Sequence, residues 1–284
     1  TGSTGNNTIK GNNGNDTLHG MNGNDRLYGG NNNDKLYGGN NNDKLFGDAG
    51  NDRLYMDAGN DLLNGGSGTD WLYVTGSAKA TVNLANTKAQ NTGYGRDTIK
   101  GIEHISGGKG VDKFTGSTGN NTIKGNNGND TLRGMNGNDR LYGGNNNDKL
   151  YGDAGNDLLK GDKGADVLEG GSGTDKLYAG VDTDTDTFVF KSIFDSIKGS
   201  KKDLIYNFDS GEDLIDLSFI DADTSTNGNQ EFEFSNTKAT ANSIWIKDMG
   251  SHLLVRADVT GDASHDFEVL INNIDDIYVD DFIL

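Results

Sequence analysis

A nine-residue period governs residues 2–73 and 107–178. It reads G-x-x-G-N-D-x-L-x, as in GNNGNDTLH at 11–19, and it passes through eight repeats in each segment without a slip in register. One repeat carries a single large apolar residue, so it cannot bury a core of its own. The repeats must therefore stack on one another, which restricts the chain to a solenoid architecture.

Position six of the repeat is an acid or an amide, and position eight is apolar. The sixth positions are Asn7, Asp16, Asp25, Asp34, Asp43, Asp52, Asp61, Asp70, Asp112, Asn121, Asp130, Asp139, Asp148, Asp157, Asp166 and Asp175. The eighth positions are Ile9, Leu18, Leu27, Leu36, Leu45, Leu54, Leu63, Leu72, Phe114, Ile123, Leu132, Leu141, Leu150, Leu159, Leu168 and Leu177. The tripeptide around the apolar residue predicts a short strand, and the Gly- and Asn-rich remainder predicts a turn with left-handed backbone. Two strands and two turns make one coil of 18 residues.

Composition indicates that such a stack needs more than an apolar core. Leu, Ile, Val and Phe make up 27 of residues 1–178, or 15%, against 33 of the last 106, or 31%. A share below about 20% in a charged chain is typical of disorder. The chain has no Cys, so disulfides cannot supply the missing stability. Another cross-link between coils is required.

Calcium meets this requirement. It is a hard cation that takes 6–8 oxygen ligands from carboxylates and backbone carbonyls. Turns on one side of the stack recur every 18 residues, so an ion between two turns could bind one Asp from each, such as Asp25 with Asp43 or Asp34 with Asp52. The binding free energy of the ions then becomes folding free energy.

The nonapeptide resembles the RTX repeat, GGxGxD followed by an apolar residue between two others. GGSGTDWLY at 65–73 and GGSGTDKLY at 170–178 match that consensus closely. The resemblance implies an all-β fold, a right-handed parallel β-roll loaded with calcium. It implies that carbonyls at turn positions one to four join the Asp as ligands. Asn7 and Asn121 each weaken one pair of turns, which leaves five complete pairs per run and about ten ions.

The resemblance assigns ligand roles to carboxylate and turn residues of both runs. In the first run they are Asp16, Met21, Gly23, Asp25, Gly29, Gly30, Asn31, Asn32, Asp34, Gly38, Gly39, Asn40, Asn41, Asp43, Gly47, Ala49, Gly50, Asp52, Ala58, Gly59, Asp61, Gly65, Ser67 and Asp70. In the second run they are Gly108, Gly110, Asp112, Gly125, Asn127, Gly128, Asp130, Gly134, Asn136, Gly137, Asp139, Gly143, Asn145, Asp148, Gly152, Ala154, Gly155, Asp157, Gly161, Lys163, Asp166, Gly170, Ser172 and Asp175.

Two segments depart from the period. Between the runs, ATVNL at 80–84 and DTIKGIEHI at 97–105 predict two strands of a β-hairpin-like insert. After 178, alternating and β-branched stretches predict an antiparallel cap on the solenoid, with strands at 203–208, 213–219, 243–248, 252–258 and 267–274. The predicted organisation is a first block at 1–73, the insert at 74–106, a second block at 107–186 and a C-terminal domain at 187–284.

The C-terminal block resembles that of serralysin-type secreted proteins. DTFVF at 186–190, DLIYNFDSGEDLIDLSF at 203–219 and DFIL at 281–284 carry the likeness. An acid before three apolar residues at the C-terminus looks like a type I secretion signal. The resemblance implies an extracellular protein that partners with the type I secretion machinery and folds outside the cell, where calcium is abundant.

Catalytic motifs are missing from the sequence. The four histidines form no HExxH, and neither a GxSxG with triad partners nor a GxxxxGK[ST] loop occurs. Residues 1–38 and 115–152 are identical at 37 of 38 positions, and only the second copy is preceded by another repeat. We therefore expect a piece of a longer protein whose catalytic part, if any, lies outside this chain. No apolar run suits a membrane span, and we expect a monomer without a nucleic-acid partner.

The outer strand positions offer an alternative function. Positions seven and nine should face outward, and they pair cations with aromatic residues. They include Arg26, Tyr28, Lys35, Tyr37, Lys44, Phe46, Arg53, Tyr55, Trp71, Tyr73, Arg140, Tyr142, Lys149 and Tyr151. Residues 1–178 carry a net charge of only −3, so loaded calcium would make them cationic. An anionic polysaccharide such as alginate could bind there, its sugars stacking on aromatic rings. Cross-strand packing explains the same columns, and the Asn rows of the turns leave ice binding as a third possibility.

Overall fold

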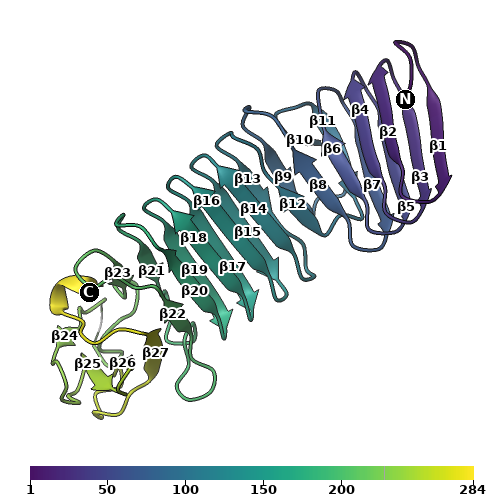
Figure 1. The fold of residues 1–284 in the computed structure, drawn as a ribbon. Helices are drawn as coiled ribbons and strands as arrows, with labels where there is room; N and C mark the ends of the chain where they lie inside the picture. The colour runs from purple at the N-terminus through teal and green to yellow at the C-terminus, as the bar shows by residue number, and fades with distance from the viewer. Residues whose placement is uncertain (227) are drawn as a thin grey trace. The chain divides into compact units, whose positions relative to one another are not determined.

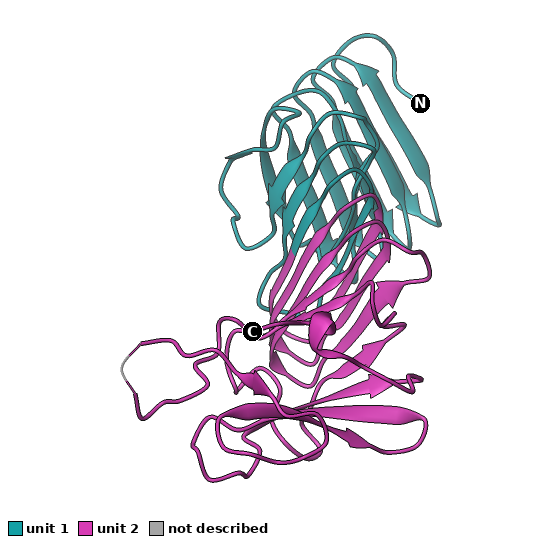
Figure 2. Ribbon diagram, turned by 90° about the vertical axis from the view of Figure 1, so that its left-hand side faces the viewer, with its two compact units in different colours: residues 1–132 teal, residues 133–284 magenta. Residues whose placement is uncertain are grey.

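The computed structural model describes residues 1–226 and 228–284 and is all-β. The chain forms two compact units, residues 1–132 and 133–284 (Figure 2). Each is a parallel solenoid, and the second also carries antiparallel strands. Apart from one 3₁₀ turn at Val279–Asp281, the described residues contain no helix, and no helix there is suited to crossing a membrane.

The first unit begins with two parallel sheets that share the 18-residue register. One sheet contains β1 (Thr8–Asn13), β3 (Arg26–Asn31), β5 (Lys44–Ala49) and β7 (Leu62–Ser67). The other contains β2 (Thr17–Asn22), β4 (Lys35–Asn40), β6 (Arg53–Met56) and β8 (Trp71–Val74). Leu27 pairs with Leu45, and Leu45 with Leu63, so that β3, β5 and β7 follow one another in their sheet (Figure 1). Successive repeats thus alternate between the sheets.

The strands are longer than the predicted tripeptide. They include the glycine at position one of the next repeat, which is closely surrounded by other atoms. Most strands continue into the first three residues of the next repeat. A β-carbon at Gly20, which is position one, would lie 2.5 Å from both Asp25 Oδ2 and the Gly38 carbonyl oxygen. Position one is therefore glycine for steric reasons. Leu27 and Leu36 are fully buried, so the apolar ladder forms the expected core.

The insert continues the solenoid. The strands β9 (Thr81–Asn83), β10 (Gln90–Asn91), β11 (Arg96–Lys100), β12 (His104–Ser106), β13 (Lys113–Thr115) and β14 (Thr122–Asn127) complete the unit. Ile99 pairs in parallel with Leu63, and Ile105 with both Leu72 and Ile123.

The predicted hairpin between 80–84 and 97–105 is therefore wrong. The segment 97–105 forms most of two strands in different sheets, and β9 pairs in parallel with β13. Within the described part of this segment, the short β10–β11 pair is the one antiparallel pairing. The physical reason is that Asp97 and Glu103 each stand two residues before an inward Ile, as position six does in a repeat.

The second unit repeats this architecture. Strand β15 (Thr131–Asn136) spans the boundary at residue 132. One sheet contains β16 (Arg140–Asn145), β18 (Leu158–Lys163), β20 (Lys176–Gly180) and β22 (Leu204–Tyr206). The other contains β17 (Lys149–Gly155), β19 (Val167–Gly173), β21 (Thr187–Val189), β23 (Leu214–Asp216) and β28 (Phe282–Ile283). Parallel pairing therefore continues well past the last regular repeat.

The predicted antiparallel cap is confirmed for three of its five strands, whereas the segments 203–208 and 213–219 hold strands that pair in parallel with the solenoid. Strands β25 (Ser243–Asp248), β26 (His252–Ala257) and β27 (Phe267–Asn272) pair antiparallel. Strand β27 joins the solenoid by pairing in parallel with β22, and the short β24 (Glu233–Phe234) lies beside β25. The cap has a real apolar core, in which the rings of Phe190 and Phe267 meet edge to face at 5.1 Å.

Candidate metal sites

A ladder of aspartates links successive coils. The backbone N–H of Asp25 donates to Asp43 Oδ1 at 2.7 Å, and the N–H of Asp43 donates to Asp61 Oδ1 at the same distance. In the second unit the N–H of Asp157 donates to Asp175 Oδ1, also at 2.7 Å. One carboxylate oxygen of each Asp thus has a structural partner in the coil 18 residues away.

The other carboxylate oxygen is left for a ligand. Oδ2 is buried and accepts no hydrogen bond in ten of the repeat aspartates. They are Asp16, Asp25, Asp34, Asp43, Asp52, Asp61, Asp70, Asp157, Asp166 and Asp175. A buried charged oxygen without a partner costs several kcal/mol, of order 1–3 even for a neutral group. A regular row of them indicates that a cation belongs beside each.

The raised pKa values of the buried aspartates also indicate a cation site. Burial raises the pKa of Asp43 to about 6, and that of Asp61 and of Asp175 to about 8. Carboxylates of neighbouring coils add to the effect, for instance Asp157 beside Asp175. A bound divalent cation would reverse this effect by favouring the ionised carboxylates.

Backbone carbonyls converge on the same places. The Gly38 carbonyl oxygen and Asp25 Oδ2 both lie 2.5 Å from the position of a β-carbon at Gly20. A β-carbon at Gly47 would lie 2.3 Å from Asp52 Oδ2 and 2.4 Å from the Gly65 carbonyl oxygen. Carboxylate and carbonyl oxygens are the donors that calcium prefers, so these residues fit the ion. The complete ligand sets implied for the turns stay a prediction.

Several members of the ladder lie outside the regular period. Asp61 N–H donates to Asp97 Oδ1 at 2.7 Å across a 36-residue separation. Asp186, Asp203 and Asp213 extend the ladder of the second unit, accepting from the backbones of Asp166, Asp175 and Asp186, at 2.8, 2.7 and 2.9 Å. Sequence reasoning missed all four. The signal was an Asp two residues before a buried apolar residue, which the search for a fixed nine-residue spacing passed over.

The two amides at position six accept hydrogen bonds within their own turns. Asn7 Oδ1 accepts the backbone N–H of Ser3 at 2.5 Å, and Asn121 Oδ1 accepts that of Ser117 at 2.6 Å. Both amides thus support their own turn. A neutral amide oxygen is also a weaker calcium ligand than a carboxylate.

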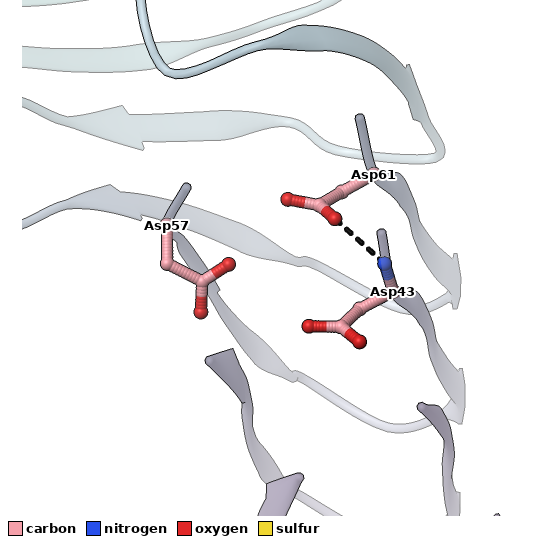
Figure 3. Close-up of side chains that lie close together, drawn as sticks. All are labelled: Asp43, Asp57 and Asp61. Carbon is pink, nitrogen blue, oxygen red and sulfur yellow. Dashed lines mark hydrogen bonds between the residues drawn. The ribbon is translucent and has the colours of Figure 1, made fainter. Parts of the chain in front are cut away.

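Three carboxylates from two neighbouring turns of the first unit lie close together. Asp43, Asp57 and Asp61 each offer an oxygen within 4.8 Å of the others, and Figure 3 shows the three side chains around a common space. Asp57 was absent from the predicted ligands, which took backbone carbonyls from the turn positions and side chains from position six alone. Among the described residues this is the one group of three such side chains close enough to hold one ion.

Asparagines form a second ladder in the opposite direction. The backbone N–H of Asn42 donates to Asn24 Oδ1 at 3.0 Å, and that of Asn60 donates to Asn42 Oδ1 at 2.8 Å. Asp side chains thus accept from the preceding coil and Asn side chains from the following one. Asn at position five is explained by this structural role.

Aromatic side chains form a stacked column on the outer face of the sheet with β2, β4, β6 and β8. Ring centroids are 4.6 Å apart for His19 and Tyr37, 4.0 Å for Tyr37 and Tyr55, and 5.1 Å for Tyr55 and Tyr73. Both faces of Tyr37 and Tyr55 are therefore covered by other rings. This stacking favours the cross-strand packing interpretation for these two rings, and a role for them in sugar binding stays a prediction.

Cations line a groove beside that column. It has a volume of about 580 Å³ and is lined by Lys35, Arg53 and Trp71 together with Asn33 and Asn51 of the Asn ladder. A similar groove in the second unit is lined by Arg140, Lys160 and Lys176. In both, position-six aspartates are among the lining residues, so cations bound to them would make the grooves more positive.

The nonapeptide period, the parallel solenoid and the buried row of carboxylates define a calcium-binding β-roll. The family model of the RTX calcium-binding nonapeptide repeat (4 copies) matches residues 1–36, 37–72, 91–123, 106–141, 124–159 and 151–186. These matches cover more than half of the chain, which therefore belongs to the RTX repeat family.

Two solved structures are similar to parts of the chain. The AlgE6R3 subunit of the Azotobacter vinelandii mannuronan C5-epimerase is 23% identical, with 60% of this chain and 76% of that one covered and a TM-score of 0.34. The extracellular lipase LipA of Serratia marcescens is 18% identical, with 92% of this chain and 40% of that one covered and a TM-score of 0.33. No curated protein matches the chain. Likeness at this level defines neither activity nor substrate.

Proposed function

We propose that this chain is the calcium-dependent folding and type I secretion module of a larger secreted bacterial protein. The observation that carries the proposal is the row of ten buried Oδ2 atoms without a hydrogen-bond donor. Without a cation, the ionised row disfavours the folded state, and the sparse apolar core cannot compensate. With calcium outside the cell, the same row holds the coils together.

The C-terminal tetrapeptide fits this order of events. Phe282 pairs with Ile215, and the backbone N–H of Leu217 donates to the Ile283 carbonyl at 2.8 Å. Asp281 is buried and accepts the backbone N–H of Gly211 at 2.7 Å. In the folded protein the tetrapeptide is therefore paired into the parallel solenoid, so a secretion machine would read it before folding. The module itself carries no catalytic role in this proposal.

Circular dichroism tests the folding part. In EGTA, the far-UV spectrum should show little β-structure, and millimolar calcium should restore it, since extracellular calcium modules bind at roughly 10⁻⁴–10⁻³ M. Equal β content in both conditions overturns the folding switch. Export is tested separately by removing residues 281–284 in a host with a type I system, which should leave the protein inside the cells.

A second candidate function is binding of an anionic polysaccharide, and the cation-lined grooves favour it. Lys35 and Arg53, the first residues of β4 and β6, line the groove of the first unit. A uronate polymer would bind these cations without ring stacking. Titration with alginate in calcium should then give binding that weakens with salt. The Asn Oδ1 atoms are used within the ladder, so ice binding gains no support from them; normal ice growth in the protein's presence would remove it.

A further inference from the structure

The turn that contains Asp57 has an unusual backbone. At the second turn position φ is positive in six other repeats of residues 2–73. These are Asn12 (73°), Met21 (88°), Gly30 (107°), Gly39 (103°), Asp48 (72°) and Gly66 (107°). Asp57 occupies the equivalent position but is not among the described residues with positive φ. The chain therefore follows a different path through this turn.

Met56 explains the difference. It stands at position one, where the other complete repeats of this run have glycine. At Gly47, the equivalent position one repeat earlier, a β-carbon would lie 2.3 Å from Asp52 Oδ2. A methionine cannot adopt that arrangement, and the Met56 side chain is instead buried in the core at 1% exposure, with its backbone paired to Val74. As a result, the backbone at Asp57, the next residue, takes a different direction from the one it has in the other turns.

The redirected Asp57 faces two buried carboxylates. Figure 3 shows its side chain turned toward Asp43 and Asp61, and its Oδ2 accepts the backbone N–H of Gly39 at 2.5 Å. Asp43 is 1% exposed and Asp61 4%, and the Oδ2 atom of each is buried without a hydrogen bond. Two orphaned oxygens thus point into a space that a third carboxylate closes.

Asp48 shows that an Asp at position two is not enough to bring a third carboxylate to the position-six aspartates. It has the same position in the preceding repeat, but it keeps the positive φ and its side chain is exposed. The difference between Asp48 and Asp57 is therefore set by the residue before each, Gly47 or Met56. This pair supplies a matched control within one chain.

We propose that Asp43, Asp57 and Asp61 form a three-carboxylate calcium site that binds more tightly than the other sites of the roll and fills first. The inference rests on the proposed calcium-dependent folding. The number of charged ligands and the rigidity of the site set calcium affinity in proteins. Asp57 adds one charge, and its bond to Gly39 fixes it between turns 18 residues apart. An additional negative charge in a buried site attracts the ion strongly.

Calcium binding at controlled free concentration tests the proposal. The full chain, Asp57→Asn and Asp48→Asn are dialysed against EGTA-buffered calcium, and bound ions per chain are counted. The unaltered chain and Asp48→Asn should bind one ion at free calcium roughly ten-fold or more below the midpoint for the others. Asp57→Asn should lose this early step, while circular dichroism at saturating calcium still shows a folded roll.

A second variant tests the role of Met56. Met56→Gly keeps every carboxylate but restores the ordinary turn, so it should also lose the early step. Persistence of that step in Asp57→Asn, or its loss in Asp48→Asn, overturns the three-carboxylate site. A chain that folds with calcium but binds all ions in one step overturns this inference alone. A chain that neither binds calcium nor changes its β content overturns the proposed function as well.

Discussion

The carboxylate of Asp43 has two separate tasks. Its Oδ1 accepts the backbone N–H of Asp25 at 2.7 Å, whereas its Oδ2 is buried and accepts no hydrogen bond. The first oxygen sets the spacing between two coils, and the second is available to a cation. This division makes the structural and the metal-binding contributions of one side chain separable by mutation.

Asp43→Asn and Asp43→Ala should differ in a defined way. The amide keeps an oxygen for the Asp25 N–H but loses the charge, so calcium-induced folding should need more calcium with little other change. Alanine also leaves that N–H buried and unpaired, which should cost a further 1–3 kcal/mol or so. Calcium titration and urea unfolding in saturating calcium measure the two effects. Equal stability of the two variants in calcium would contradict the assignment of Oδ1.

Gly38→Ala should block a metal site directly. A β-carbon there would lie 2.4 Å from Asp43 Oδ2, and Gly38 is not in the left-handed region, so the effect is steric. We expect a clear increase in the calcium midpoint of folding and a lower melting temperature. Gly5→Ala is the control, because a β-carbon at Gly5 meets no atom within 4 Å. A similar response of both variants would argue against the crowded position.

Acid should partly replace calcium. Burial raises the pKa of Asp43 to about 6 and that of Asp61 to about 8 in the folded state, above the value of about 3.9 in an unfolded chain. Raised carboxyl pKa values mean that the folded state binds protons more tightly. This contribution is complete below the unfolded pKa and is lost as pH rises through 6 to 8.

The measurement is β content in EGTA as a function of pH. It should be greater near pH 5 than near pH 8, and saturating calcium should flatten the profile. An EGTA profile that rises with pH would contradict the expected sign.

The cap should respond oppositely, because Glu268 is a buried carboxylate with cationic partners. Arg256 Nη2 lies 2.8 Å and Lys202 Nζ 3.2 Å from its oxygens. Although burial alone would raise it, hydrogen bonds from Arg256 and Lys202 bring the pKa of Glu268 below its ordinary value. Its contribution is therefore present above the unfolded pKa and lost as pH falls through the folded one.

Glu268→Gln tests this ion cluster. It should destabilise the calcium-loaded protein by about 3 kcal/mol, since it leaves partly buried cations without a counter-charge. The calcium midpoint of the repeats should change little by comparison. Glu231→Gln, at an exposed side chain, is the control for urea unfolding. A loss of stability as large in Glu231→Gln would contradict the role of the cluster.

The solenoid could be predicted from sequence because positions six and eight of the nonapeptide recur at strictly nine-residue spacing. Leu27 and Asp25 recur in kind every nine residues, and that spacing alone decides the coil and the ladder. Asp97 and Asp203 could not be found in this way, since loops of different length separate them from Asp61 and Asp175. Their local pattern, an Asp two residues before a buried Ile, is too common to be specific by itself.

Asp57 was missed for another reason. Its place in a metal cluster depends on the backbone path, which changes because Met56 replaces a glycine. The substitution can be read from the sequence, but its effect on the direction of the next side chain depends on the folded turn. The covered ring faces of Tyr37 likewise follow from stacking distances that spacing alone does not give.

The alternation of repeats between two sheets gives the chain a natural unit of length. Each Asp accepts a hydrogen bond from the Asp 18 residues before it. If one whole coil is removed from a run, the coils on either side can therefore form the same Asp-to-Asp hydrogen bond with each other. Removing nine residues would move each later strand to the opposite sheet and pair unlike outer columns, such as Tyr37 with Phe46. Arrays of this kind can thus change length in steps of two repeats. The near-identical segments 1–38 and 115–152 begin 114 residues apart, and that distance includes the irregular insert.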